Sequence, residues 1–229
     1  MYLKEVAGSC ALWLAVACGF QASGAGVIYQ FDNGFSGTNP NGPAPWVMET
    51  LQDVSPGTVM LTVTNVNVTS SEKITELYLN INPNYNVSAL QFSFVSGSAG
   101  VTAPLPSLGE DSFKADGDGK YDILFQFSQT PSTSFGPNDY LVYQITGIPT
   151  LTSSDFVFMS SPAGGHGPFY SAIHVQGIAS TSVGDTGSYS GWVSPTTYTP
   201  LTVPEPGSLA FMLAGATTAV CWRRRLSRR

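Results

Sequence analysis

Cysteine is absent from the long middle part of this sequence, residues 26–203. The chain has three cysteines, and they lie in its two hydrophobic ends: Cys10, Cys18 and Cys221. No disulfide can therefore join two parts of the middle region, so its stability must come from a buried core. The region is long enough to form one domain with a substantial interior.

Arginine is also absent from residues 26–203, and three lysines stand there against thirteen acidic residues. This region carries a net charge of −10, whereas the whole chain is at −6 because five arginines lie at its end. Proteins bind phosphate backbones by neutralising them with lysine and arginine. A strongly acidic region of this kind excludes nucleic acid as a partner.

Between its two ends the chain lacks any segment with the 3.6-residue period of an amphipathic helix. Apolar and polar residues instead alternate with a period of two, as in 58–68, 73–81 and 121–128, and turn-forming residues separate such runs. Many short strands at close spacing favour an all-β fold. We therefore predict an antiparallel β-sandwich or jelly roll over residues 26–193.

The N-terminal end has the order of a secretory signal peptide. Lys4 precedes the apolar run 10–20, and the small residues of QASGAG follow that run. The run is well short of the roughly 20 apolar residues that a membrane span needs. We therefore interpret residues 1–25 as a signal peptide that is cleaved after Gly24 or Ala25, and we expect the domain to be exported.

The composition changes again near the end of the predicted domain. Ser, Thr, Gly and Pro dominate residues 179–203, which is typical of a stalk. Trp192 is large and apolar for a free linker. We therefore expect order up to Val193 and a Ser/Thr/Pro linker over residues 194–202.

The apolar segment 207–222 contains no formally charged residue. As a helix it would be roughly 24 Å long, so it predicts a single short C-terminal transmembrane helix. The arginines of the tail, residues 223–229, follow it directly: Arg223, Arg224, Arg225, Arg228 and Arg229. Basic residues stay on the cytoplasmic side of a span, so we expect them to hold the tail inside and the domain outside.

Directly before this segment stands the triplet Pro204-Glu205-Pro206. Its prolines keep the chain extended where it reaches the membrane, and Pro206 suits the first turn of a helix. The triplet, the short span and the arginine-rich end together resemble the PEP-CTERM sorting signal over residues 203–229. The tail of that family is also called the ice-binding protein C-terminal domain.

The resemblance implies a route of maturation. An exosortase, a membrane-embedded processing enzyme, would recognise the tail, cut it near the triplet and pass the protein to the cell surface or the extracellular matrix. The chain would be held in the inner membrane until that step. Proteins with this tail are typical of bacteria that make exopolysaccharide and biofilm.

Three carboxylates in the stretch KADGDGKYD are the best candidates for a metal site. Asp116, Asp118 and Asp122 lie at spacings that calcium-binding loops use. Lys120 lies between them, however, and Phe127 occupies the place of the acid that closes an EF-hand loop. The alternative is a hairpin turn, because Asp-Gly is a strong hairpin signal. We expect the turn, and no cofactor.

The sequence contains no nucleophile elbow, P-loop or dinucleotide-binding pattern. His166 lies in a Gly-rich loop and His174 in a predicted strand. They could bind a metal only if the fold joined them, and we interpret them instead as a surface loop residue and a satisfied strand residue. The densest acidic cluster, formed by Glu110, Asp111 and Asp116, is the support for a third alternative, a secreted hydrolase. Its turn-rich setting argues against catalysis, so we expect a protein that is not an enzyme.

These observations favour an exported, exosortase-sorted surface or matrix protein that is associated with exopolysaccharide. The alternative is a carbohydrate-binding module of the matrix, in which Trp46 and Trp192 present flat faces to sugar rings. Aromatic residues in this number are more often part of a core. Ice binding through Thr62 and Thr64 has little support, because exposed threonines are common in sheets.

Overall fold

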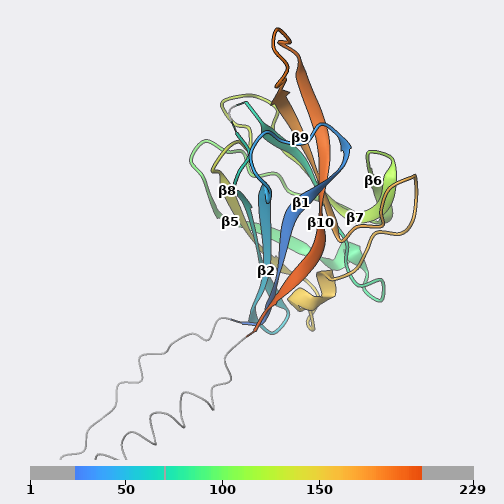
Figure 1. Cartoon of the computed structure of the whole chain (residues 1–229). Coiled ribbons are helices and arrows are strands. Elements are labelled where there is room, and N and C mark those ends of the chain that lie inside the picture. Colours follow the sequence, from blue (N-terminus) through green and yellow to red (C-terminus); the bar gives the residue numbers. More distant parts are fainter. Residues whose placement is uncertain (1–23, 70, 203–229) are drawn as a thin grey trace, which may run out of the picture.

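The computed structural model describes residues 24–69 and 71–202 (Figure 1). Within these residues the chain forms ten strands and two short 3-10 helices, so the prediction of an all-β domain is confirmed. The elements in chain order are β1 (Gly26–Gly37), β2 (Val47–Ser55), β3 (Thr58–Asn65), β4 (Lys73–Leu79), η1 (Val87–Ala89), β5 (Gln91–Gly97), β6 (Ser107–Ala115), β7 (Asp118–Gln126), β8 (Tyr140–Thr146), η2 (Ser153–Phe156), β9 (Ser171–Ala179) and β10 (Ser188–Leu201).

The described strands form one sheet in the order β5-β8-β3-β2-β1-β10-β9-β4-β7-β6. Every neighbouring pair is antiparallel, as predicted. The predicted division into two packed sheets is wrong, because this sheet is continuous and curls on itself. The rings of Phe92 on β5 and Phe125 on β7 lie 5.5 Å apart, although these strands are near opposite ends of the sheet.

The two long central strands, β1 and β10, account for the bending. Their pairing shifts register between Tyr29 and Phe31, between Phe31 and Asn33, and between Gly34 and Ser36. Each shift places an extra residue on one of the two strands, which bends the strand and increases its twist. One continuous sheet can therefore enclose the core that the sequence was expected to place between two sheets.

Alternating side chains of the strands fill this core. In β3, Val59, Leu61 and Val63 are buried, whereas the residues between them are half-buried, as a period of two predicts. The largest fully buried side chains are Tyr29, Tyr121, Tyr143, Phe31, Phe125, Phe135, Phe156, Leu51, Leu61, Ile74, Leu77 and Leu79. Burial of aromatic and aliphatic surface thus stabilises a domain that no disulfide can link.

The predicted linker over residues 194–202 is wrong for most of its length. β10 continues to Leu201 and pairs there with the start of β1. β9 accompanies β10 only as far as Val193, and the side chains of residues 196–200 are exposed. Their polar composition therefore reflects a strand that is paired on one side and open to solvent, not a free stalk.

The first and the last described strands consequently end side by side. Gly26 lies opposite Leu201, and both ends of the described chain lie at one pole of the domain (Figure 1). The predicted signal peptide, except for its last two residues, and the predicted span over 207–222 lie outside the described residues. Within the part that is described, no helix is long and apolar enough to cross a membrane.

The carboxyl group of Glu49 is completely enclosed by the domain. Glu49 on β2 is fully buried, and its Oε2 lies 3.1 Å from the hydroxyl of Ser171 on β9. That hydroxyl lies 2.7 Å from the backbone oxygen of Tyr78. The Ser171 hydroxyl has one hydrogen, which it can donate to Glu49 Oε2 or to the backbone oxygen of Tyr78. Burial raises the pKa of Glu49 to about 8, against the opposing effect of the Ser171 hydrogen bond.

We predict that this group makes the domain less stable as the pH rises. The carboxyl of Glu49 has a pKa near its ordinary value of 4.5 in the unfolded chain and about 8 in the folded domain. Its stabilising contribution is complete below the first value and is lost as the pH rises to the second, because folding then requires proton uptake. The slope approaches about 1.4 kcal/mol per pH unit. Glu49→Gln should remove it in urea unfolding curves.

The matched control is Glu110→Gln, because Glu110 is exposed. We expect the difference in unfolding free energy between Glu49→Gln and the wild type to move in favour of the variant from pH 5 to pH 8. The difference between Glu110→Gln and the wild type should stay nearly constant. If Glu49→Gln and the wild type had parallel pH profiles, Glu49 would not be protonated in the folded domain.

Candidate functional site

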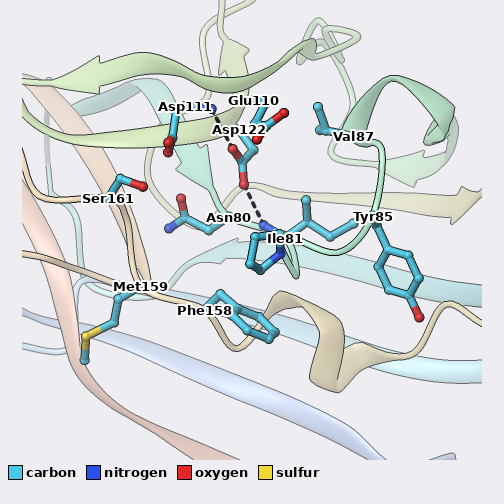
Figure 2. A pocket seen from close by; sticks show the side chains of 11 residues that line it. Asn80, Ile81, Tyr85, Val87, Glu110, Asp111, Asp122, Phe158, Met159 and Ser161 are labelled. Carbon is cyan, nitrogen blue, oxygen red and sulfur yellow. Dashed lines mark hydrogen bonds between the residues drawn. The ribbon is translucent and has the colours of Figure 1, made fainter.

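A small pocket lies beside the hairpin formed by β6 and β7 (Figure 2). The other sides of this pocket come from the segment after β4 and the segment before β9. Its volume is about 110 Å³, below the roughly 300–1,000 Å³ of pockets for drug-sized ligands. It is lined by Asn80, Ile81, Pro83, Tyr85, Val87, Glu110, Asp111, Asp122, Phe158, Met159 and Ser161.

Asp122 joins three parts of the chain at the acidic side of the pocket. Its Oδ1 accepts the backbone N–H of Asp111 at 2.8 Å, and its Oδ2 accepts the backbone N–H of Ile81 at 3.1 Å. The dashed lines in Figure 2 mark these two bonds. Because both oxygens are engaged, Asp122 holds β7, β6 and the segment after β4 together and fixes the shape of the pocket.

β6 contributes two consecutive carboxylates, Glu110 and Asp111. They lie where the pairing of β6 with β7 is irregular, between Leu108 and Phe113. Asp111 has a left-handed backbone with φ 48°, a conformation that Asp and Asn adopt more readily than most residues. Consecutive residues of a regular strand point to opposite faces. The irregularity therefore lets both acidic residues line one pocket.

Asn80 presents another acceptor from a buried position. Asn80 is 3% exposed. Its Nδ2 donates to the backbone oxygens of Phe169 at 3.3 Å and Tyr170 at 3.0 Å. These two bonds use both amide hydrogens. The carbonyl oxygen Oδ1 has no partner among the described residues, and in Figure 2 it points toward the side of the pocket that carries Asp111.

Apolar side chains form the opposite side of the pocket. Phe158 and Met159 lie below the carboxylates in Figure 2, and Met159 is 51% exposed. The Tyr85 hydroxyl is hydrogen-bonded to Thr150 Oγ1 at 3.1 Å, which holds the tyrosine ring at the rim. The pocket therefore pairs hydrogen-bond acceptors and negative charge with aromatic and CH surface.

The three aspartates of the predicted calcium loop do not converge. Asp116 and Gly117 have φ values of 52° and 79° and form the turn of the β6–β7 hairpin, which is the Asp-Gly hairpin expected from the sequence. The side chain of Asp116 accepts the Ser36 hydroxyl, whereas Asp122 lies in the pocket. Among the described residues, no group of three His, Cys, Asp or Glu side chains could hold a metal ion.

Asp118 is instead covered by the loop that carries His166. Its Oδ1 accepts the backbone N–H of His166 at 2.8 Å, and its Oδ2 lies 2.7 Å from His166 Nδ1. The backbone N–H bond of His166 lowers the pKa of Asp118 most strongly, and the side-chain bond adds to this effect. Asp118 is buried, whereas the His166 side chain is 54% exposed. The pair closes a loop over the hairpin.

Trp46 does not offer a stacking face, so this part of the predicted sugar site is wrong. It is 5% exposed, and its Nε1 donates to the backbone oxygen of Gly42 at 2.7 Å. The indole belongs to the main hydrophobic core, with its one donor already used. A large apolar residue at the start of a strand is more often a core residue, and the sequence alone could not place it.

Trp192 lies on the other face of the sheet and is half-buried. The ring of His174 lies parallel to the indole, with 4.2 Å between ring centroids and 8° between the planes. Tyr78 and Phe35 approach the indole at 5.8 and 6.4 Å. Burial lowers the pKa of His174, so the stacked imidazole is neutral at pH 7. His174 thus covers one face of the indole that was predicted to bind sugar.

Comparison with known protein families adds one finding. Residues 202–225 match the PEP-CTERM protein-sorting motif, which confirms the resemblance predicted from Pro204-Glu205-Pro206 and the arginines that follow. This motif marks an exported protein that is held transiently at the membrane and processed by an exosortase-type membrane enzyme. No curated protein and no solved structure matches the chain. The triplet and the arginines of the tail lie outside the described residues.

The pocket is the feature that the sequence did not reveal as a unit. The sequence shows Glu110 and Asp111 as neighbouring acidic residues, but no pattern in it relates Asn80 or Phe158 to them. They come from segments far apart in the chain, and the curl of the sheet brings them to the same hairpin.

We predict that calcium does not stabilise this protein. The carboxylates of Asp116, Asp118 and Asp122 are separated, and each already has a hydrogen-bond donor. A cation that binds only the folded state raises the melting temperature. With calcium at about 2 mM, the concentration range of weak extracellular sites, the melting temperature should differ from that in EDTA by less than about 1 °C. A rise of several degrees that Asp116→Ala abolishes would contradict this.

Proposed function

We propose that this chain is an exported, exosortase-sorted protein of the cell surface or extracellular matrix, without catalytic activity and associated with exopolysaccharide. The observation that supports it is the sorting motif at residues 202–225, which follows directly on β10. Since β10 ends at Leu201, the folded domain reaches the processing segment with no intervening stalk.

The arrangement of the strands fits processing at both ends of one domain. Gly26 lies next to the predicted signal-peptide cleavage sites and is paired with Leu201. Both processing steps would therefore act at the same pole of the domain (Figure 1). The rest of the domain surface would face away from the membrane, toward the matrix.

The carboxylates support a non-catalytic role better than a hydrolase. Glycoside hydrolysis needs two carboxyl groups that flank the scissile bond, one of them free to donate a proton. Asp122 already accepts two backbone N–H groups, and Asp116 lies at the hairpin turn outside the pocket. Glu110 and Asp111 are consecutive residues on one side of the pocket and do not flank it.

A carbohydrate-binding module is the second candidate. The observation that favours it is the pocket itself, in which acceptors from Asn80 and Asp111 face the apolar side formed by Phe158. Sugar-binding sites combine hydrogen-bonding groups with aromatic surface in this way. The uncovered part of Trp192 remains a second, separate surface for such contacts.

We predict a mature protein that lacks both ends. Intact-mass spectrometry of surface protein from the native host should give a mass without residues 1–24 or 1–25 and without residues 210–229. Pro204→Ala combined with Pro206→Ala should leave the C-terminal segment attached, because the extended triplet is lost. Pro162→Ala, in an exposed loop, is the control and should mature normally. Surface protein that retains its arginine-rich end would contradict the sorting step.

A further inference from the structure

We propose that the pocket beside the β6–β7 hairpin binds the free ammonium group of an amino-sugar unit. This inference rests on the proposed association with a matrix polysaccharide, and it names the chemistry by which the domain would recognise one. The ligand is a hexosamine whose nitrogen is not acetylated. The argument uses the hydrogen-bonding groups, the charge and the shape of the pocket.

The polar side of the pocket consists almost entirely of acceptors. The carboxylates of Glu110 and Asp111 can only accept hydrogen bonds when ionised. Asn80 has used both amide hydrogens on backbone oxygens, so its Oδ1 is the atom left for a ligand. Asn80 as a whole is only 3% exposed. Because Asn80 lines the pocket, a group with several N–H donors can reach this oxygen and hydrogen-bond to it.

The charge of the pocket is uncompensated within the described residues. The basic side chains found there close to a carboxylate are His166, beside Asp118, and His174, beside Glu76, and neither contact lies in the pocket. Residues 26–203 carry a net charge of −10 and have no arginine. An ammonium group would therefore gain charge-assisted hydrogen bonds here, whereas an anionic sugar would be repelled.

The shape of the pocket favours a compact organic cation over a metal ion. Calcium takes six to eight oxygen ligands, but one side of this pocket is apolar, with Phe158 and Met159. A volume of about 110 Å³ has room for a group of several heavy atoms, not for an oligosaccharide. An amino sugar brings ring CH surface within one bond of its ammonium group. The ring can lie against Phe158 while the nitrogen reaches the acceptors.

The test uses the full-length chain in an uncharged detergent and saturation-transfer NMR of small sugars. Glucosamine should bind saturably with a dissociation constant in the millimolar range, which is about −4 kcal/mol. N-acetylglucosamine should bind at least about tenfold more weakly, because it has lost the charge and gained bulk. Combining Glu110→Gln with Asp111→Asn should weaken glucosamine binding by about tenfold or more.

These two substitutions are chosen to keep the fold. Both residues are exposed, and asparagine tolerates the left-handed backbone of Asp111. Asp122 is left intact because it holds three segments together. The matched control is Asp185→Asn, at an exposed position away from the pocket, which should bind glucosamine like the wild type.

Three results would overturn the inference. Equal binding of glucosamine and N-acetylglucosamine would show that the charge is not recognised. Unchanged binding by the double variant would place the site elsewhere. Binding of n-butylamine as tight as that of glucosamine would point to a general amine site, such as one for lysine side chains. None of these results changes the intact mass of the surface protein, so failure here is distinguishable from failure of the sorting proposal.

Discussion

The pairing of β1 with β10 is the interaction on which the rest of this structure depends. These strands are the first and the last of the described chain, and they lie at the centre of the sheet. Their side chains Tyr29, Phe31 and Val193 are buried in the core. In the strand order of the described sheet, this pair joins the half from β5 to β2 to the half from β9 to β6. The bulges in it bend the sheet until its two halves face each other.

Several features follow from that geometry. Glu49 on β2 can reach Ser171 on β9 because β1 and β10 bend between them. The same bend brings η1 and the segments around the β6–β7 hairpin together, where Asp122 closes the pocket. The pairing also requires the end of the domain to be synthesised before the first strand finds its partner. For an exported chain, the sorting motif at 202–225 therefore follows the very residues that complete the fold.

The sequence predicts what depends on neighbouring residues. Alternation identified strands such as β3, and the Asp116-Gly117 pair identified a hairpin turn, because period and turn chemistry are local. Strand partners are not local, so one curled sheet could not be told from two packed ones. The end of β10 was missed for a different reason. The side chains of residues 196–200 are exposed. The backbone there pairs with β1, but the sequence shows no alternation of apolar residues that would predict a strand. Asn80 and Phe158 meet only through the fold.

The most direct test of the central pairing is to compare the thermal unfolding of two fragments, residues 25–202 and residues 25–193. The shorter fragment ends where the sequence placed the limit of the domain, and it lacks the residues of β10 that lie opposite Gly26, Val27, Ile28 and Tyr29. We expect the longer fragment to unfold cooperatively. The shorter one should melt at least about 10 °C lower, or fail to fold. Equal melting temperatures for the two fragments would contradict the role assigned to the β1–β10 pair.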